Sequence, residues 1–221
     1  MARRAMKPTL LFAVGALGLL GLFGYFQHAA LGEPAGSVGT IEGTVDNPLI
    51  ATDTAVVYLK DVPGVYPPPK EGGTMSQKKI TFNPKVLAVQ VGSKVLCPND
   101  DTVTHNIFSP QKSAKAFTFG LYPPGSNKEL ELTKVGVVPF LCNIHAEMGA
   151  FCVVCPNPFF AKTEKDGKFK IENVPVGTYK ITFWHEKLKP KTVEVTVTAG
   201  KTETVNFNGL DKGKYSIDLL K

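Results

Sequence analysis

Arginine is almost absent from this 221-residue chain, and its absence narrows the classes of partner. Arg3 and Arg4 are its only arginines. The part of the chain that follows residue 7 contains 22 lysines and 19 acidic residues, which gives it a net charge of +3. Planar arginine forks are the usual groups that bind phosphate and read bases. We therefore expect no nucleic-acid partner, and a mildly positive surface that suits at most the steering of an acidic protein.

Histidine is also scarce, which limits the enzymes that this chain can form. The chain has four histidines: His28, His105, His145 and His185. If one metal centre uses two of them, a second histidine-rich centre cannot be built. No Ser-His-Asp order, paired-carboxylate pocket or glycine-rich phosphate loop stands out. We interpret Asp100 and Asp101 as turn residues and His185 as a surface or packing residue, and we expect no enzymatic activity.

Long apolar runs are absent except at the N-terminus. Thr9 to Phe26 is apolar and follows Arg3, Arg4 and Lys7. Eighteen residues is long for the apolar core of a signal peptide and just sufficient to span a bilayer. The basic flank places the N-terminus in the cytoplasm and sends the rest outward. Residues 1–32 are therefore expected to be a cleaved signal peptide or a membrane anchor with an apolar helix, and the remainder to be extracytoplasmic, in the periplasm or at the cell surface.

No long amphipathic helix pattern follows this run, and the remaining chain favours strands. Val38 to Val45 alternates with period two, and Ala55 to Leu59 is typical of a short buried strand. Residues 62–73 are rich in proline and glycine and mark a change in composition. The alternation resumes at Lys79, and we interpret Ser109 to Gly125 as a loop whose aromatic residues either line a site or pack the loop. These features predict an all-β sandwich fold.

Four side chains with metal-binding chemistry occur in two short stretches. Cys142, His145 and Met148 follow an apolar strand pattern, and His105 lies 37 residues before Cys142. A thiolate, two imidazoles and a thioether form the donor set of a blue-copper centre, in which the methionine is a weak axial ligand. Zinc also accepts Cys and His but rarely a thioether. Because His105 must come from a different strand end, only a folded sandwich can bring the four donors together.

The stretch from Asn99 to Asn106, together with the Cys-x2-His-x2-Met pattern, resembles the cupredoxins, and the short ligand loop most resembles amicyanin and plastocyanin-like members. The resemblance covers about residues 75–155, and we expect a cupredoxin Greek-key β-sandwich over residues 75–157. It implies one type 1 copper ion with four ligands: His105, Cys142, His145 and Met148. It further implies that Asn106 supports the site by a hydrogen bond that ties the two ligand-bearing loops together.

The resemblance to cupredoxins implies outer-sphere transfer of single electrons. It makes the ring edge of His145 the electron port, surrounded by an apolar patch for transient docking. We expect Gly149, Ala150 and the Pro123–Pro124 loop in the rim of that patch. Weak, small interfaces suit such exchange, so the expected partners are exported redox proteins or a membrane electron-transfer complex. Anchoring through residues 9–26 would hold the chain at the membrane.

Two other functions compete with electron transfer. A copper-binding or delivery protein at the cell surface would use the same ligands but usually carries additional Met or His clusters. Met75 and Met148 are the only methionines after the N-terminal run, so such a cluster is missing. A metal-free structural or interaction module would retain the fold with a broken ligand set, whereas the set here is intact.

The last part of the chain has a different pattern. Ala161 to Ile171 contains a strand, an Asp-Gly hairpin signal and a second strand. This part resembles the carboxypeptidase regulatory-like, transthyretin-like β-sandwich, whose usual first strands match residues 38–61. We therefore interpret residues 38–61 and 158–209 as a second, smaller sandwich that the cupredoxin stretch interrupts, with a scaffold or docking role. The alternative assigns residues 38–61 to the cupredoxin as extra strands. Residues 210–221 are a tail or an edge strand.

The other three cysteines allow several interpretations. Cys152 and Cys155 lie three residues apart in a strand pattern, so they point to opposite faces and are poorly placed to bridge or chelate. Cys97 and Cys152 both point inward by alternation. They could form a disulfide in an exported protein, offer competing thiols to copper, or remain buried free thiols that pack as small apolar groups.

Overall fold

The structure is a computed structural model that describes residues 37–213. This range contains sixteen β-strands and one short 3-10 helix, η1 (Pro48–Ala51), so the described chain is all-β as predicted. No helix within this range is long and apolar enough to cross a membrane. The predicted signal peptide or anchor with its apolar helix, residues 1–32, lies outside the described residues, as does the part of the predicted tail that follows residue 213.

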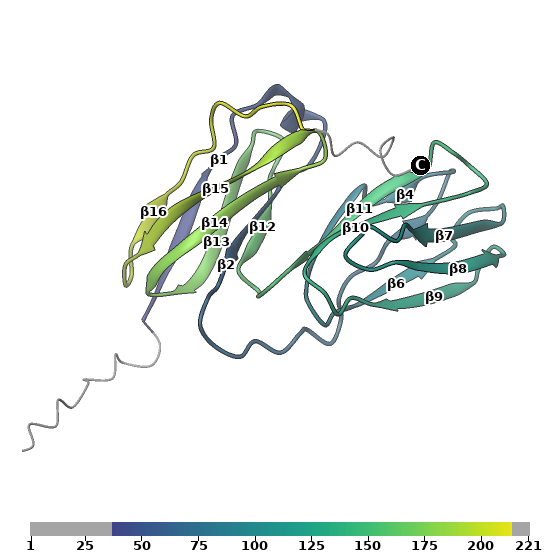
Figure 1. Cartoon of the computed structure of the whole chain (residues 1–221), viewed down its shortest axis with the longest axis horizontal. Helices are drawn as coiled ribbons and strands as arrows, with labels where there is room; N and C mark the ends of the chain where they lie inside the picture. Colours follow the sequence, from purple (N-terminus) through teal and green to yellow (C-terminus); the bar gives the residue numbers. More distant parts are fainter. Residues whose placement is uncertain (1–36, 214–221) are drawn as a thin grey trace, which may run out of the picture. The chain divides into compact units, whose positions relative to one another are not determined.

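Two sheets combine strands from both ends of the described chain, and we call them the flanking sandwich (Figure 1). The three-stranded sheet has the order β13 (Lys168–Pro175), β1 (Val38–Thr44), β16 (Thr202–Thr204). The four-stranded sheet has the order β12 (Phe160–Lys162), β2 (Val56–Lys60), β14 (Gly177–His185), β15 (Leu188–Val197). In Figure 1 the purple β1 lies among the green and yellow C-terminal strands. The strands before residue 61 thus pair with strands that follow residue 159.

Inward-facing residues of both sheets form one apolar core in the flanking sandwich. Its fully buried members include Ile41 of β1, Leu59 of β2 and Phe183 of β14. Burial of each such side chain contributes about 1.5–3 kcal/mol. Strand β1 and the segment that follows its neighbour β16 approach closely at Gly43, where a Cβ would lie 1.6 Å from the Val205 carbonyl oxygen. Only glycine fits there, since any side chain would push β1 away from the segment that follows β16.

The strands between β2 and β12 form the central sandwich. Its five-stranded sheet has the order β5 (Val86–Gln90), β11 (Gly149–Cys155), β10 (Gly136–Leu141), β7 (His105–Ser109), β8 (Phe117–Tyr122). Two further pairs complete it: β3 (Ser76–Gln77) with β4 (Phe82–Asn83), and β6 (Lys94–Pro98) with β9 (Asn127–Glu131). Its core contains Phe82, Val138 and Phe140, all on the inward faces of their strands.

Strand β11 contributes to two apolar clusters. Ala150, Cys152 and Val154 lie in the core of the central sandwich. Phe151, Val153 and Cys155 lie on its other face, in a cluster that includes Val56 of β2 and Trp184 of β14. This division follows from the period-two alternation of a strand, and it confirms that Cys152 and Cys155 point to opposite faces. All four cysteines of the chain are free, so the alternative of a Cys97–Cys152 disulfide is wrong.

The interpretation of residues 109–125 as a loop is wrong in part, because β8 occupies Phe117–Tyr122 and pairs with β7. Its inward residues are held by the core: the Phe117 ring lies 5.4 Å from the Phe140 ring, and Tyr122 is buried. Gly120 has a φ of +65°, and the register of the pair shifts. These irregularities interrupt the alternation by which a strand is recognised in a sequence.

The Asp-Gly hairpin predicted within residues 161–171 is also wrong, although the turn itself forms. Strand β12 pairs with β2, whereas β13 pairs with β1, so the two strands enter different sheets. The turn closes against the end of β1, where the Val45 N–H donates to the Gly167 carbonyl oxygen at 2.9 Å. A local turn signal indicates a change of direction but cannot determine which strands then pair.

Candidate metal centre

Three of the four predicted donor side chains meet at one end of the central sandwich. The donor atoms of His105, Cys142 and His145 all lie within 4.8 Å of one another. His105 begins β7 and Cys142 follows the end of β10. Because β7 and β10 are antiparallel neighbours, the start of one strand lies beside the end of the other. The sheet topology therefore brings together residues that are 37 positions apart in the sequence.

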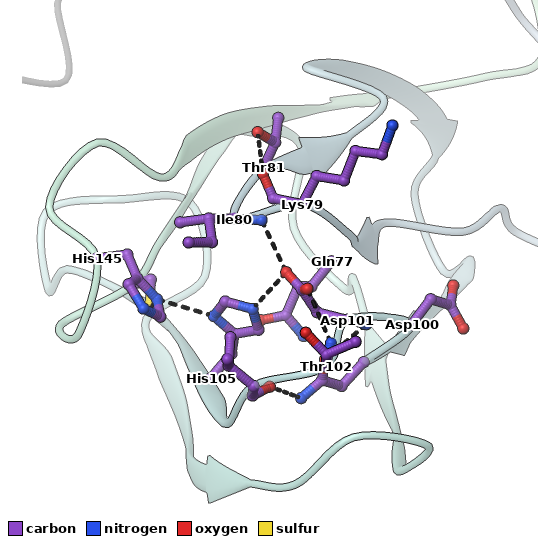
Figure 2. A network of polar contacts seen from close by, with 12 residues as sticks. Gln77, Lys79, Ile80, Thr81, Asp100, Asp101, Thr102, His105 and His145 are labelled. Atoms are coloured by element: carbon purple, nitrogen blue, oxygen red, sulfur yellow. Dashed lines mark hydrogen bonds and ion pairs between the residues drawn. The ribbon is translucent and has the colours of Figure 1, made fainter.

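The two imidazoles face each other through the same type of nitrogen. His105 Nδ1 lies 3.1 Å from His145 Nδ1, and Cys142 Sγ lies 3.9 Å from the same His145 nitrogen. Figure 2 shows the His145 ring directed at the His105 ring. A metal ion needs unprotonated nitrogen and sulfur lone pairs that point to one place. The two Nδ1 atoms and the Cys142 sulfur lie at separations at which one ion can bind all three after deprotonation.

Met148, the fourth predicted donor, lies inside the protein beside this group. It is 2% exposed and belongs to the same apolar cluster as Cys142. Its backbone N–H donates to the His145 carbonyl oxygen at 3.0 Å. The chain therefore makes a tight turn between His145 and Met148 before it enters β11, which returns the methionine to the core.

Asn106 connects the two segments that carry the donors. Its side-chain Oδ1 accepts a hydrogen bond of 2.8 Å from the backbone N–H of Asn143, the residue after Cys142. Asn106 is itself buried in β7, next to His105. The contact is of the kind that the resemblance to cupredoxins implies for this residue, and it fixes the position of the loop that follows β10 relative to β7.

Asp101 is a member of the site that the sequence analysis missed. Its Oδ2 lies 3.0 Å from His105 Nε2, on the side of the ring away from His145 (Figure 2). Hydrogen bonds from the Ile80 N–H, from His105 and from the Thr102 N–H lower the pKa of Asp101 to about 2. The carboxylate is thus ionised at neutral pH and can only accept. His105 Nε2 must donate to it, which leaves the Nδ1 lone pair free to face His145 and Cys142.

A sequence signal for this role exists in the spacing between Asp101 and His105. Metal-binding histidines usually donate their second ring nitrogen to a carboxylate or carbonyl group, so a carboxylate four residues before a predicted ligand is a candidate. The interpretation of Asp100 and Asp101 as turn residues was incomplete. Asp100 accepts a hydrogen bond of 2.6 Å from the Ser76 hydroxyl, and Asp101 holds His105.

The two imidazoles differ in their access to solvent. His105 is fully buried, whereas His145 is only partly buried. Two apolar residues near the site are exposed: Ile144, beside His145 in the loop, is 47% exposed, and Ile80, whose N–H donates to Asp101, is 37% exposed. Ala150 is fully buried in the core, so its predicted place in an exposed rim is wrong. The inward position of Ala150 follows from its even spacing with Cys152 along β11.

The other three thiols are poorly suited to bind a metal ion. Burial raises the pKa of Cys97 to about 12 and raises the pKa values of Cys152 and Cys155. Since the thiolate is the form that binds metal, these cysteines are poor competitors for a metal ion. Within residues 37–213, the group of His105, Cys142 and His145 is the one set of three or more such side chains close enough to share an ion.

His185 lies in the flanking sandwich, away from any such group in the described chain. It is fully buried at the end of β14, and its Nδ1 accepts a hydrogen bond of 3.1 Å from the Lys187 N–H. Burial lowers its pKa. Of the two roles considered for it, surface residue or packing residue, the structure shows packing.

Comparison with known proteins gives one match to a protein family. Residues 157–209 match the family model of the carboxypeptidase regulatory-like domain. The recognition of this domain in the C-terminal part is confirmed. A search of curated proteins found no match.

Several solved structures are similar to this chain, and cupredoxins are among them. A purple cupredoxin from Nitrosopumilus maritimus is 24% identical, with 37% of this chain and 98% of that chain covered and a TM-score of 0.34. A reduced amicyanin variant is 17% identical, with 44% and 97% covered and a TM-score of 0.36. A copper-containing nitrite reductase from Thermus scotoductus is 21% identical, with 51% and 28% covered and a TM-score of 0.36.

Proposed function

We propose that this chain is an exported type 1 copper protein that carries single electrons between redox partners by outer-sphere transfer. The observation that carries the proposal is the convergence of His105, Cys142 and His145, whose donor atoms lie within 4.8 Å of one another beside the buried Met148. One thiolate, two imidazoles and a thioether are the donor set of blue-copper electron-transfer sites. A copper ion held by these residues would supply a one-electron redox couple.

The surrounding residues hold the donors in place before any metal binds. His105 is fixed by Asp101, the loop after Cys142 is fixed by Asn106, and Met148 is fixed by the core. When the ligands of a site cannot move, the geometry of the site changes little as the charge on its ion changes. Pre-organisation of this kind favours rapid electron exchange. Cys142 and Met148 are also screened from water, which suits soft sulfur donors and a redox-active ion.

His145 is the donor through which an electron would enter or leave. It is partly exposed, and its neighbour Ile144 presents an apolar side chain to solvent. Small apolar surfaces suit short-lived contacts between redox proteins. The proposed partners are therefore exported redox proteins or a membrane electron-transfer complex, the proposed location is extracytoplasmic, and the chain is proposed to have no enzymatic activity of its own.

The same proposal includes a domain organisation. The central sandwich is a cupredoxin Greek-key sandwich, residues 75–157, inserted into a smaller transthyretin-like sandwich made of residues 38–61 and 158–209. Its support is strand pairing: β1 lies between β13 and β16, and β2 lies between β12 and β14. The flanking sandwich then serves as a scaffold or docking module.

A visible absorption titration of the chain with Cu(II) tests the proposed function. We expect an intense thiolate-to-copper band that saturates at about one equivalent and is lost in Cys142→Ser. Chemical reduction should bleach the band, and reoxidation should restore it. Copper binding without that band, or reduction of the added copper with oxidation of thiols, would contradict electron transfer and favour copper delivery.

A further inference from the structure

The turn between β3 and β4 has an unusual backbone. Lys79 and Ile80 have φ values of 56° and 55°, and the Lys78 N–H donates to the Thr81 carbonyl oxygen at 3.0 Å across the turn. Two-residue hairpin turns with positive φ at both positions favour Asn-Gly. A left-handed conformation is unfavourable for most residues and a clear outlier for a β-branched one. Something outside the turn must therefore hold Ile80 in this conformation.

Burial of the Ile80 side chain is incomplete, because 37% of it is exposed. Its backbone N–H, by contrast, donates a hydrogen bond of 2.7 Å to Asp101 Oδ2. This is the same oxygen that lies 3.0 Å from His105 Nε2. Figure 2 shows the carboxylate between the turn and the imidazole ring. One ionised oxygen thus accepts from both the turn and a proposed copper ligand, and hydrogen bonds to a charged acceptor are stronger than neutral ones.

The hairpin contacts the loop before His105 at two further points. The Ser76 hydroxyl donates to Asp100 Oδ2 at 2.6 Å, and Gln77 forms an isolated parallel bridge with Asn99. Asn99 in turn accepts from the Asp101 N–H at 3.1 Å. Three successive residues of the loop, at positions 99–101, are therefore each held by the hairpin, so the Ile80 contact is part of a continuous attachment.

We propose that the β3–β4 hairpin is a positioning element for the metal centre. Its left-handed turn holds Asp101 in place, and Asp101 fixes the His105 ring with Nδ1 toward Cys142 and His145. The inference rests on the proposed copper role of His105, and it assigns a function to residues 76–81, which contribute no metal donor. The conformation of Ile80 is unfavourable for the turn itself and is explained by the carboxylate that it holds.

The decisive variant changes the turn without touching Asp101 or His105. Lys79→Pro fixes φ near −65°, which is incompatible with the left-handed turn and moves the Ile80 N–H away from Asp101. Proline also favours an extended residue before it, and Lys78 directly follows strand β3. Lys79→Asn is the matched control, because asparagine tolerates the left-handed region.

The first readout uses the metal-free protein. NMR of the imidazole nitrogens should show a His105 Nε2–H proton that exchanges slowly with water in the wild type and in Lys79→Asn. In Lys79→Pro we expect exchange to be at least about tenfold faster, and the Cu(II) dissociation constant to rise about 10- to 100-fold, as is typical when a partner of a ligating histidine is lost. A folded Lys79→Pro protein with wild-type exchange and affinity overturns the proposal.

A second variant covers the case in which Lys79→Pro does not fold. Asp101→Ala removes the acceptor, so hydrogen exchange of the Ile80 amide should be at least about tenfold faster than in the wild type. Unchanged Ile80 exchange overturns the proposal. If the exchange results are as expected but the wild type gives no thiolate-to-copper band, the copper function fails while the positioning of His105 by the turn stands.

Discussion

The two histidines of the candidate centre are held in different ways. His105 is fully buried, and its second nitrogen is bound by Asp101. His145 lies on the short loop between β10 and β11 and is partly exposed. The position of His145 is explained by the contacts of its Nδ1 and by the turn to Met148, which constrains the backbone at His145. Replacement of the two rings should therefore have different consequences.

We expect His145→Gly to be restored by added imidazole and His105→Gly not to be restored. A small ligand can enter from solvent at the partly exposed position, whereas the buried position would have to admit it through the core and leave the Asp101 carboxylate without its partner. Recovery of the thiolate-to-copper band during an imidazole titration measures the difference. Equal recovery in the two variants would contradict the assignment of His145 as the accessible ligand.

Asp53 offers a separate residue-scale test, by pH. Burial raises its pKa, but the hydrogen bond from Lys187 at 2.6 Å and the charge of Lys85 outweigh this effect and leave the pKa below the ordinary value of 3.8. The folded pKa is thus the lower one. Asp53 stabilises the fold fully above about pH 4, and this contribution is lost as the pH falls through the folded pKa.

The corresponding variant is Asp53→Asn. It should lower the free energy of unfolding by about 1–3 kcal/mol near neutral pH, because the ionised acceptor of Lys187 and Lys85 becomes a neutral amide. The difference from the wild type should shrink below about pH 4. Urea unfolding at several pH values measures it, with Asp61→Asn as an exposed control. A difference that grows as the pH falls would show that the folded pKa of Asp53 is raised.

At the scale of strands, the two faces of β11 pack in different apolar clusters. Its inward residues pack behind the candidate centre, and Phe151 packs away from it, with its ring 5.5 Å from that of Trp184. Phe151→Ala should therefore cost about 3–5 kcal/mol of stability while the thiolate-to-copper band stays unchanged in the folded protein. Chemical denaturation and the visible spectrum of the same sample give both values. A shifted band would indicate that the outer face of β11 also shapes the site.

The sequence predicted the elements whose signal is carried by side chains. The alternation in residues 38–45 corresponds to β1, and the apolar strand pattern before Cys142 corresponds to β10. The four predicted donors were recognisable by their chemistry alone. The features that the sequence did not predict depend on backbone conformation. Gly120 and a register shift interrupt the strand pattern of β8, so this strand was not recognised. The hydrogen bond from the Ile80 N–H to Asp101 depends on a left-handed turn that a Lys-Ile pair does not favour. No residue pattern in the sequence therefore predicts this hydrogen bond.

At the scale of the whole described chain, the point where the chain leaves the flanking sandwich lies beside the point where it re-enters that sandwich. The Leu59 N–H donates to the Phe159 carbonyl oxygen at 3.0 Å, and the Asn157 side chain donates to the Leu59 carbonyl oxygen at 3.0 Å. Strands β3 to β11, which all lie between these points, form the central sandwich. Closely spaced ends are what make an insertion between two strands tolerable.

This geometry predicts that the flanking sandwich can fold without the central one. If a short glycine-containing turn replaces residues 62–156, every strand pair of β1, β2 and β12–β16 remains within the shortened chain. We expect cooperative unfolding and a dispersed NMR spectrum, with lower stability than in the full chain because Val56 and Trp184 lose their apolar neighbours on β11. A matched variant that carries Trp184→Lys should reduce the association caused by the newly exposed surface. A shortened chain that stays unfolded even with this substitution would mean that the flanking sandwich depends on the central one for its structure, and that the two form a single folding unit.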